Sequence, residues 1–165
     1  MHAVVWIAEG TWEACVDQAA PLLPADADIT LLHVAPSDVE DFAARGGARL
    51  LGRHPPPPPS ASLRAVAEEE AEALLADASS RLARRARMDS RCGSVEREVV
   101  AACVGADLLI CARGGQLRLG PDSVSKRTRF VVDHAPCAVL LVWAGPPPGT
   151  ETIPLPPPAP PKRVT

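Results

Sequence analysis

Residues 106–143 read ADLLICARGGQLRLGPDSVSKRTRFVVDHAPCAVLLVW and predict a strand, a loop, a helix and a second strand. The runs 107–111 (DLLIC) and 138–143 (AVLLVW) are almost continuously apolar, which is typical of strands covered on both faces of a parallel sheet. A helix is expected over residues 123–134, and Pro136 follows its end because proline cannot continue a helix. Two buried strands joined by a crossover helix indicate the α/β class.

The same alternation extends toward the N-terminus. Three further segments of strand length are expected, of which the last is the least apolar: residues 3–8 (AVVWIA), 29–34 (ITLLHV) and 88–92. Helical segments are expected between them, with weak character in the second: residues 11–20, 38–51, 62–87 and 95–104. The pattern therefore predicts one α/β domain built on five parallel strands.

Proline separates this domain from two excursions. Of the 19 prolines, 14 fall within residues 55–59 and 146–161. We therefore expect the α/β domain to span residues 1–144, with a Pro-rich surface insert at about 54–61. Residues 145–165 are expected to form a disordered Pro-rich tail, since such a segment cannot bury enough apolar surface to fold.

Composition argues against several classes of protein. The chain carries 17 basic and 20 acidic residues, whereas nucleic-acid-binding domains usually present a strongly basic face, so no nucleic-acid partner is expected. No apolar run reaches the roughly 18 residues of a membrane span, so no membrane partner is expected. The five cysteines are scattered and form no CxxC pair, which favours reduced thiols in the cytoplasm. Neither the cysteines nor the four histidines show the spacing of a metal site.

Three loops are candidates for a binding site. Ligands of parallel α/β sheets bind beyond the carboxyl ends of the strands, near the point where the strand order reverses. Here that rule selects residues 9–11, 34–37 and 112–125. The third loop contains several glycines and leads into a helix, an arrangement that can hold phosphate. A tight turn explains the same glycines equally well, and helix capping explains the serines.

Taken together, these segments resemble the universal stress protein family. Residues 9–11 (EGT) are similar to the family's Asp-Gly-Ser opening, and residues 31–34 (LLHV) are similar to its second strand. Residues 106–115 and 122–143 resemble its C-terminal signature, in which HAPC precedes the last strand, so the resemblance covers residues 4–143. It implies a Rossmann-like three-layer sandwich with a five-stranded parallel sheet, and a regulatory or stress-response role.

The resemblance also implies a site for ATP or another adenine nucleotide. Glycines let the backbone approach phosphates, and the following helix N-terminus supplies N–H donors. The residues implied at the adenine end are Ala8, Glu9, Gly10, Thr11 and Val34. The residues implied at the phosphate end are Arg113, Gly114, Gly120, Ser123, Val124 and Ser125.

The sequence departs from the family's ATP-binding pattern at three points. Cys111 occupies the place of the first glycine, Asp122 occupies the place of the third, and the segment between Gly114 and Asp122 is two residues short. We therefore expect ATP binding to be weak or absent, with a dissociation constant above roughly 100 μM. The first hypothesis is an adenine-nucleotide-binding regulatory module, and the alternative is a homodimeric interaction protein that binds no nucleotide.

The last strand provides the expected partner surface. Universal stress proteins commonly dimerise, and their sheet leaves the last strand at an edge. In this chain residues 138–143 carry no charge and no proline, and an uncovered edge of this kind favours aggregation. We therefore expect a homodimer joined through Ala138–Trp143. We do not expect an enzyme, because no residue set combines a poised base, a metal-binding carboxylate pair and a group that positions water.

Overall fold

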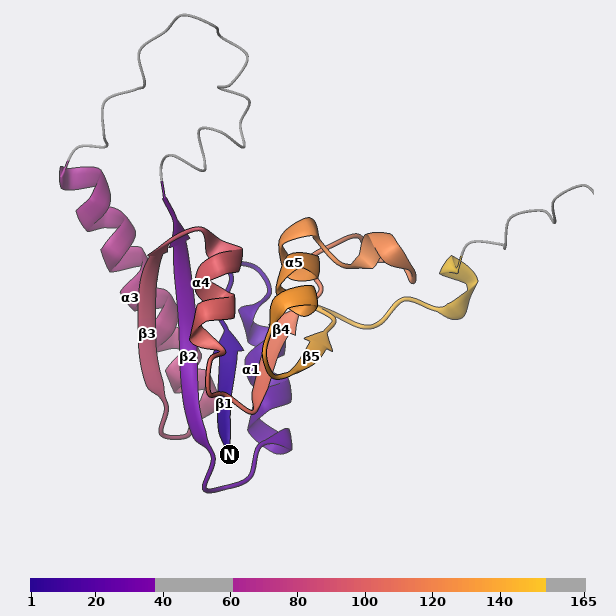
Figure 1. Cartoon of the computed structure of the whole chain (residues 1–165), viewed down its shortest axis with the longest axis horizontal. Helices are drawn as coiled ribbons and strands as arrows, with labels where there is room; N and C mark the ends of the chain where they lie inside the picture. The colour runs from indigo at the N-terminus through magenta and orange to yellow at the C-terminus, as the bar shows by residue number, and fades with distance from the viewer. Residues whose placement is uncertain (38–60, 154–165) are drawn as a thin grey trace, which may run out of the picture.

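A five-stranded sheet forms the centre of the computed structural model, which describes residues 1–37 and 61–153 (Figure 1). The strands are β1 (His2–Trp6), β2 (Asp28–Pro36), β3 (Arg87–Gly93), β4 (Leu108–Ala112) and β5 (Ala138–Val142). Neighbouring strands are all parallel, and their order is β3-β2-β1-β4-β5. The predicted five-stranded parallel sheet is therefore confirmed.

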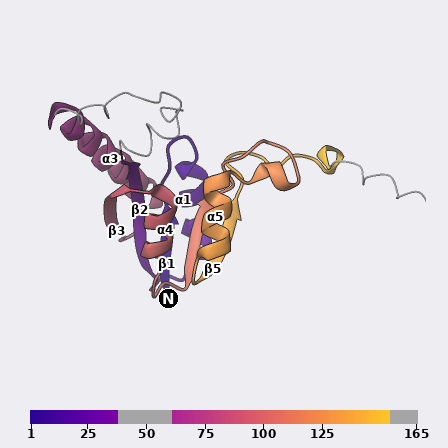
Figure 2. The same ribbon diagram turned by 45° about the horizontal axis from the view of Figure 1, so that its top comes forward.

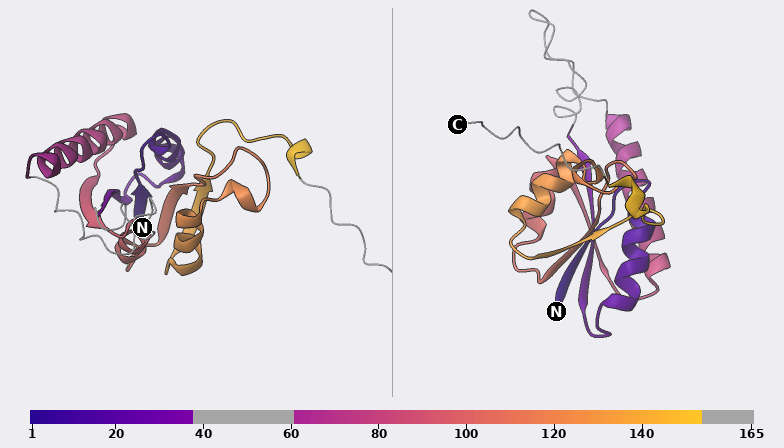
Figure 3. Two further views of the ribbon diagram at one scale, coloured as in Figure 1. Left: turned by 90° about the horizontal axis from the view of Figure 1, so that it is seen from above. Right: turned by 90° about the vertical axis from the view of Figure 1, so that its right-hand side faces the viewer.

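Helices cover both faces of the sheet (Figure 3). The helices on one face are α1 (Trp12–Leu22) and α3 (Ala61–Leu82), and those on the other are α4 (Val95–Ala102) and α5 (Lys126–His134). Successive strand residues enter opposite layers: Val5 packs with α1 and α3, whereas Val4 packs with α4 and α5. Both side chains have no exposed surface. The three-layer sandwich is confirmed, and burial on both faces explains the continuous apolar runs.

The edge strand β3 is longer than its sequence suggests. All seven of its residues pair with residues 30–36 of β2. Charged side chains lie along it: Arg91 Nη2 donates to the Asp89 carboxylate at 2.9 Å, and Arg91 Nη1 lies 3.4 Å from the Glu98 carboxylate. Charge at a sheet edge discourages pairing with a further strand, which explains why β3 lacks the apolar pattern of the central strands.

Helix α3 ends at Leu82, about five residues before the end that its sequence predicts. Ala83 has a φ of +53°, a left-handed conformation that stops an α-helix. Arg84 Nη1 then donates to the carbonyls of Ala20 at 3.3 Å and Leu23 at 3.0 Å, at the C-terminal end of α1. Arg84 therefore satisfies carbonyls of another helix instead of extending its own.

The two proline-rich segments lie largely outside the described residues. The expected insert at about 54–61 falls there except for Ala61, where α3 begins, and so does the weak helix expected at 38–51. The tail expected to be disordered from residue 145 is described as far as residue 153. Residues Thr150–Thr152 form a short 3-10 helix, η3, in which Thr152 Oγ1 accepts from the backbone N–H of Leu119 at 3.0 Å.

Candidate functional site

The central strands of the sheet lie side by side (Figure 2), and a cleft of about 560 Å³ lies at their carboxyl ends. The chain places β2 and β3 on one side of β1, and then returns to place β4 and β5 on the other side. The strand order therefore reverses between β1 and β4, and ligands of open α/β sheets bind at such a switch point. The loops that follow β1 and β4 and the last residues of β2 contribute to the cleft, which makes it the candidate site.

The cleft brings together six of the eleven residues that the resemblance implies. The six that line it are Ala8, Glu9, Thr11, Val34, Gly114 and Ser125. The five that do not line it are Gly10, Arg113, Gly120, Ser123 and Val124. Most of the residues implied at the adenine end thus converge, whereas most of those implied at the phosphate end lie elsewhere.

The loop after β1 folds around the carbonyl of Ala8. The backbone N–H groups of Thr11 and Trp12 donate to this carbonyl at 3.2 and 3.1 Å, and the Thr11 hydroxyl donates to it at 3.2 Å. Gly10 has a φ of +71°, a backbone conformation that residues other than glycine rarely adopt. Gly10 therefore shapes the turn without lining the cleft, and the Thr11 side chain binds the loop carbonyl instead of capping α1.

The loop between β4 and α5 pairs with itself. Gly114 and Val124 form an antiparallel bridge. The backbone N–H of Gly115 donates to the Ser123 carbonyl at 3.1 Å, and that of Gln116 donates to the Asp122 carbonyl at 2.8 Å. A Cβ at Gly115 would meet the Asp122 carbonyl oxygen at 2.3 Å, so this approach requires glycine. Because these two N–H groups are already bonded, they cannot hold phosphate oxygens without opening the loop.

Arg113 does not line the cleft and instead joins the loop to the residue that follows β5. Its Nη1 donates to Ser123 Oγ at 2.7 Å, and its guanidinium lies over the ring of Trp143, 4.5 Å from the centroid. Ser123 is fully buried, and its hydroxyl donates to the Gly120 carbonyl at 2.7 Å. These contacts explain why Arg113, Gly120 and Ser123 do not line the cleft.

Helix α5 begins at Lys126, three residues later than predicted. Ser125 is its N-cap, because its Oγ accepts from the backbone N–H of Thr128 at 3.1 Å. The Ser125 hydroxyl is also hydrogen-bonded to Thr128 Oγ1 at 2.9 Å, and Thr128 Oγ1 donates to the Ala112 carbonyl at 3.3 Å. These bonds join the start of α5 to the end of β4, where both border the cleft.

The two substitutions in the glycine pattern lie away from the cleft. Cys111 has no exposed surface and packs in the layer of α4 and α5, where burial raises the pKa of its thiol to about 12. The side chain of Asp122 is 62% exposed, and its carboxylate lies 3.8 Å from Arg118 Nη1. Neither residue lines the cleft, so the expected obstruction of phosphate by these two side chains is not supported. What hinders phosphate binding in this structure is instead the self-paired loop, whose two N–H groups are already hydrogen-bonded.

Several cleft residues were missed by the sequence reasoning. His33 on β2 and Arg127 on α5 both line the cleft. Helix α3 contributes four residues with the spacing of one helix face, namely Ala67, Glu70, Ala71 and Leu74. This spacing is visible in the sequence. Which part of the protein that helix face packs against, however, depends on where the crossover places α3.

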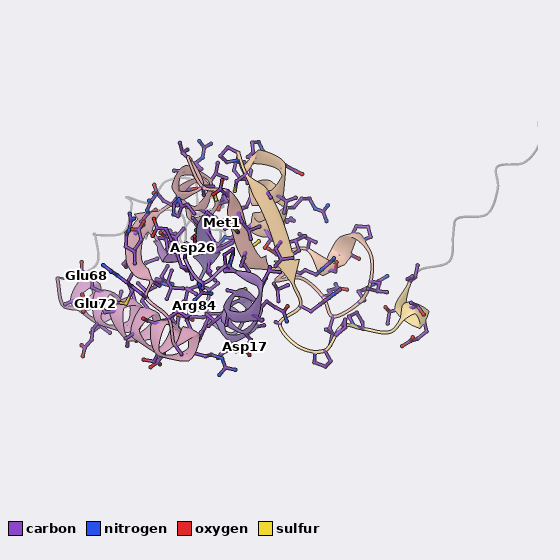
Figure 4. All side chains as sticks on the ribbon, turned by 90° about the horizontal axis from the view of Figure 1, so that it is seen from below. Met1, Asp17, Asp26, Glu68, Glu72 and Arg84 are labelled. Atoms are coloured by element: carbon purple, nitrogen blue, oxygen red, sulfur yellow. The ribbon has the colours of Figure 1, made fainter. Side chains whose placement is uncertain are left out.

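A larger cavity, of about 710 Å³, lies at the opposite end of the sheet. Figure 4 views the molecule from that end, with Asp26 and Arg84 labelled among the residues that line the cavity. Arg84 is already bonded to the end of α1, and Arg87 Nη2 lies 3.5 Å from the Asp28 carboxylate. Because parallel α/β sheets bind ligands at their carboxyl ends, we assign the site to the smaller cleft.

Across residues 1–37 and 61–153, no helix has both the length and the apolar character to cross a bilayer. Among these residues, no three His, Cys, Asp or Glu side chains gather in a way that would hold a metal ion. All five cysteines are free thiols.

Known structures share this arrangement of strands and helices. A hypothetical protein that served as a test case of structural genomics has a TM-score of 0.64 and 17% identity, over 86% of this chain and 94% of its own. A universal stress protein in complex with cAMP has a TM-score of 0.57 and 17% identity, over 88% of this chain and 98% of its own. A universal stress protein family protein from Arabidopsis thaliana with AMP bound has a TM-score of 0.56 and 16% identity, over 87% and 91%.

The chain has the fold of the universal stress proteins. The resemblance stated from residues 4–143 is therefore confirmed at the level of the fold. No model of a protein family matches the sequence, and no curated protein matches it either. In this chain, polar residues from the loops after β1 and β4, from β2 and from two helices line the cleft described above.

Proposed function

We propose that the chain is a universal-stress-protein-like regulatory module of the stress response that binds an adenine nucleotide in the cleft. The observation that carries the proposal is the position and lining of the cleft. It lies at the switch point between β1 and β4 and gathers six of the residues implied by the resemblance. Two solved structures with this fold hold AMP and cAMP, which supports the same ligand class here.

The chemistry of the lining suggests how the nucleotide lies. The base packs against the apolar side chains of Val34 and Val95, which border the cleft beside α4. The phosphate lies near the start of α5, where Arg127 brings positive charge and the first helical N–H groups attract anions. Glu9, on the loop after β1, accepts hydrogen bonds from the uncharged part of the ligand.

The self-paired loop makes ATP a poor ligand in this proposal. Phosphate-binding loops use free backbone N–H groups, and here two of them are bonded to carbonyls of the same loop. We expect a dissociation constant for Mg-ATP above roughly 100 μM, which corresponds to about 5 kcal/mol of binding free energy. A nucleotide with one phosphate needs fewer donors and is expected to bind more tightly than ATP.

Calorimetry with AMP and Mg-ATP tests this function. Arg127→Ala should weaken AMP binding by about fivefold or more, because it removes a charged donor from the cleft. Lys126→Ala is the matched control: Lys126 is the preceding residue of α5, is exposed and does not line the cleft, so its loss should change the affinity little. Absence of AMP binding at millimolar concentration, together with no nucleotide released on denaturing the purified protein, would contradict the proposal.

The second candidate function is a homodimeric interaction protein that binds no nucleotide. The edge strand β5 favours it, because Val139, Leu140 and Leu141 are only half-buried in the single chain. The closed loop between β4 and α5 also suits a protein whose cleft is unused. A stable dimer that neither carries nucleotide on purification nor binds AMP would favour this function over the first.

Either function is proposed to operate without catalytic turnover, in the cytoplasm, and without a nucleic-acid or membrane partner. The free thiols suit a reducing compartment. The net charge of −3 gives no basic field for nucleic acid. The histidine of the cleft has its Nδ1 bonded to a backbone carbonyl instead of a carboxylate, which gives no support to a nucleophile–base pair.

A further inference from the structure

His33 lies near the carboxyl end of β2, where the strand borders the cleft, on the side of the sheet that α1 and α3 cover. Its neighbour in the strand, Val34, packs in the opposite layer with α4 and α5. The ring of His33 is half-buried, and its Nδ1 lies 2.9 Å from the carbonyl oxygen of Ile7 at the end of β1. This bond holds the ring beside Ile7, which lines the same cleft.

The bond to Ile7 determines which ring nitrogen is available to a ligand. A carbonyl oxygen can only accept a hydrogen bond, so Nδ1 of His33 must carry the proton and donate. In the neutral imidazole, Nε2 then has a free lone pair and is an acceptor. No hydrogen bond joins this nitrogen to any residue in the described part of the chain.

The surroundings of His33 are also rich in acceptors. Glu70 of α3 and Glu9 of the first loop line the same cleft, and ionised carboxylates can only accept. Arg127 belongs to α5, which covers the other face of the sheet and borders the other end of the cleft. The cleft therefore has an acceptor-rich side at α3 and a cationic side at α5.

We propose that His33 is a ligand-contacting residue whose Nε2 accepts a hydrogen bond from a ribose hydroxyl of the bound nucleotide. The base and the phosphate already have complementary surroundings, at Val34 and Val95 and at Arg127. The sugar is the remaining part of the ligand, and its hydroxyls are uncharged donors that suit His33 and Glu70. The inference rests on the proposed adenine-nucleotide site and identifies the ribose as the part of the ligand that His33 recognises.

A binding cycle with two ligands and two proteins tests the contact. AMP and 2′,3′-dideoxy-AMP, which lacks both ribose hydroxyls, are titrated into the unchanged chain and into His33→Phe. The variant should weaken AMP binding by about two- to tenfold, the usual effect of one hydrogen bond, and should leave dideoxy-AMP binding unchanged. His134→Phe is the matched control. The Nδ1 of His134 also bonds to a backbone carbonyl, that of Phe130, at 2.8 Å, but His134 does not line the cleft.

A second measurement uses the unchanged chain, so it does not depend on the variant folding. In protein labelled with ¹⁵N-histidine, AMP should shift the Nε2 resonance of His33 and leave that of His134 in place, whereas dideoxy-AMP should shift neither. Equal weakening of both ligands in His33→Phe, or AMP binding without a shift at His33, would overturn this inference and leave the nucleotide site standing. Failure of AMP to bind the unchanged chain would overturn both.

Discussion

The cysteines show how burial can lower the reactivity of a side chain. Cys15 and Cys111 have no exposed surface, and burial is the main reason that the pKa of each thiol rises to about 12. The pKa of Cys103 rises to about 12 for the same reason, with a smaller contribution from the neighbouring Cys137. A raised pKa keeps the thiol protonated below that pH, and only the thiolate reacts with disulfide reagents.

We therefore expect a native thiol titration at pH 8 to detect only Cys92, which is exposed, and more slowly Cys137, which is half-buried. The other three should react only after the protein unfolds, so that denaturant releases the full five thiols. Rapid reaction of all five thiols in the native protein would show that the sheet layers open much more readily than their packing indicates.

Gly115 illustrates a position where a single atom decides the local structure. A Cβ there would meet the Asp122 carbonyl at 2.3 Å, whereas a Cβ at Gly145 meets nothing within 4 Å. Gly115→Ala should open the self-paired loop and lower the free energy of unfolding by about 1–3 kcal/mol, while Gly145→Ala should change it little. Urea unfolding compares the two variants, and amide exchange should be faster in residues 114–124 only for Gly115→Ala.

At the level of elements, α1 and α3 are joined by arginines near the end of α3. Arg81 donates two hydrogen bonds to Asp17 of α1 at 2.7 and 2.8 Å, and this pairing lowers the pKa of the Asp17 carboxyl. Arg84 donates to the carbonyls of Ala20, Leu23 and Pro24. Helix α1 contains Pro21 and has no basic residue in its own last turn, so α3 supplies the positive charge that this helix end favours.

Arg84→Ala should therefore lower the free energy of unfolding by about 1–3 kcal/mol, because backbone carbonyls of α1 lose a charged donor. Arg85→Ala is the control, since Arg85 is the next residue and exposed, and no hydrogen bond joins its side chain to the described part of α1. Urea unfolding at neutral pH measures both variants. Equal stability of the two would mean that water replaces Arg84 at the α1 carbonyls without cost.

For the whole molecule, the two edges of the sheet differ in a way that favours dimerisation at one of them. The outer strand β3 carries Arg87, Asp89 and Arg91, whereas β5 carries no charge and is half-buried over Val139–Leu141. Unpaired apolar edges associate, and pairing two copies of β5 about a twofold axis would cover both. Trp143 already packs beneath Arg113 of its own chain, so Leu140 and Leu141 remain the main apolar side chains for this interface.

We expect light scattering at micromolar concentrations to give the mass of a dimer. Leu141→Lys should shift the mass toward that of one chain, because it places a charge within the paired edge. Met88→Lys on β3 adds the same charge at the opposite edge, where Met88 is 55% exposed, and should leave the dimer intact. A single-chain mass for the unchanged protein would contradict the proposal directly.

The strands β1, β2, β4 and β5 were predictable because each contains a local apolar run typical of a parallel sheet, whereas the charged edge strand β3 lacks that pattern. The site was predictable in part, because the rule that ligands bind beyond the carboxyl ends of parallel strands locates loops without side-chain coordinates. Glu9, Thr11 and Val34 were found in this way. The second predicted strand contains His33, but a strand pattern does not indicate which of its polar residues reaches the cleft.

The sequence by itself determined the α/β class, the five parallel strands and the end of the sheet at which a ligand would bind, because these follow from residues close together in the chain. Only the tertiary structure decided that Arg113 contacts Ser123 and Trp143, and that Glu70 of α3 lines the same cleft as His33. Those partners are separated by 10 to 37 residues in the sequence. Contacts of this kind depend on where the crossovers bring distant segments together, and no local pattern records that position.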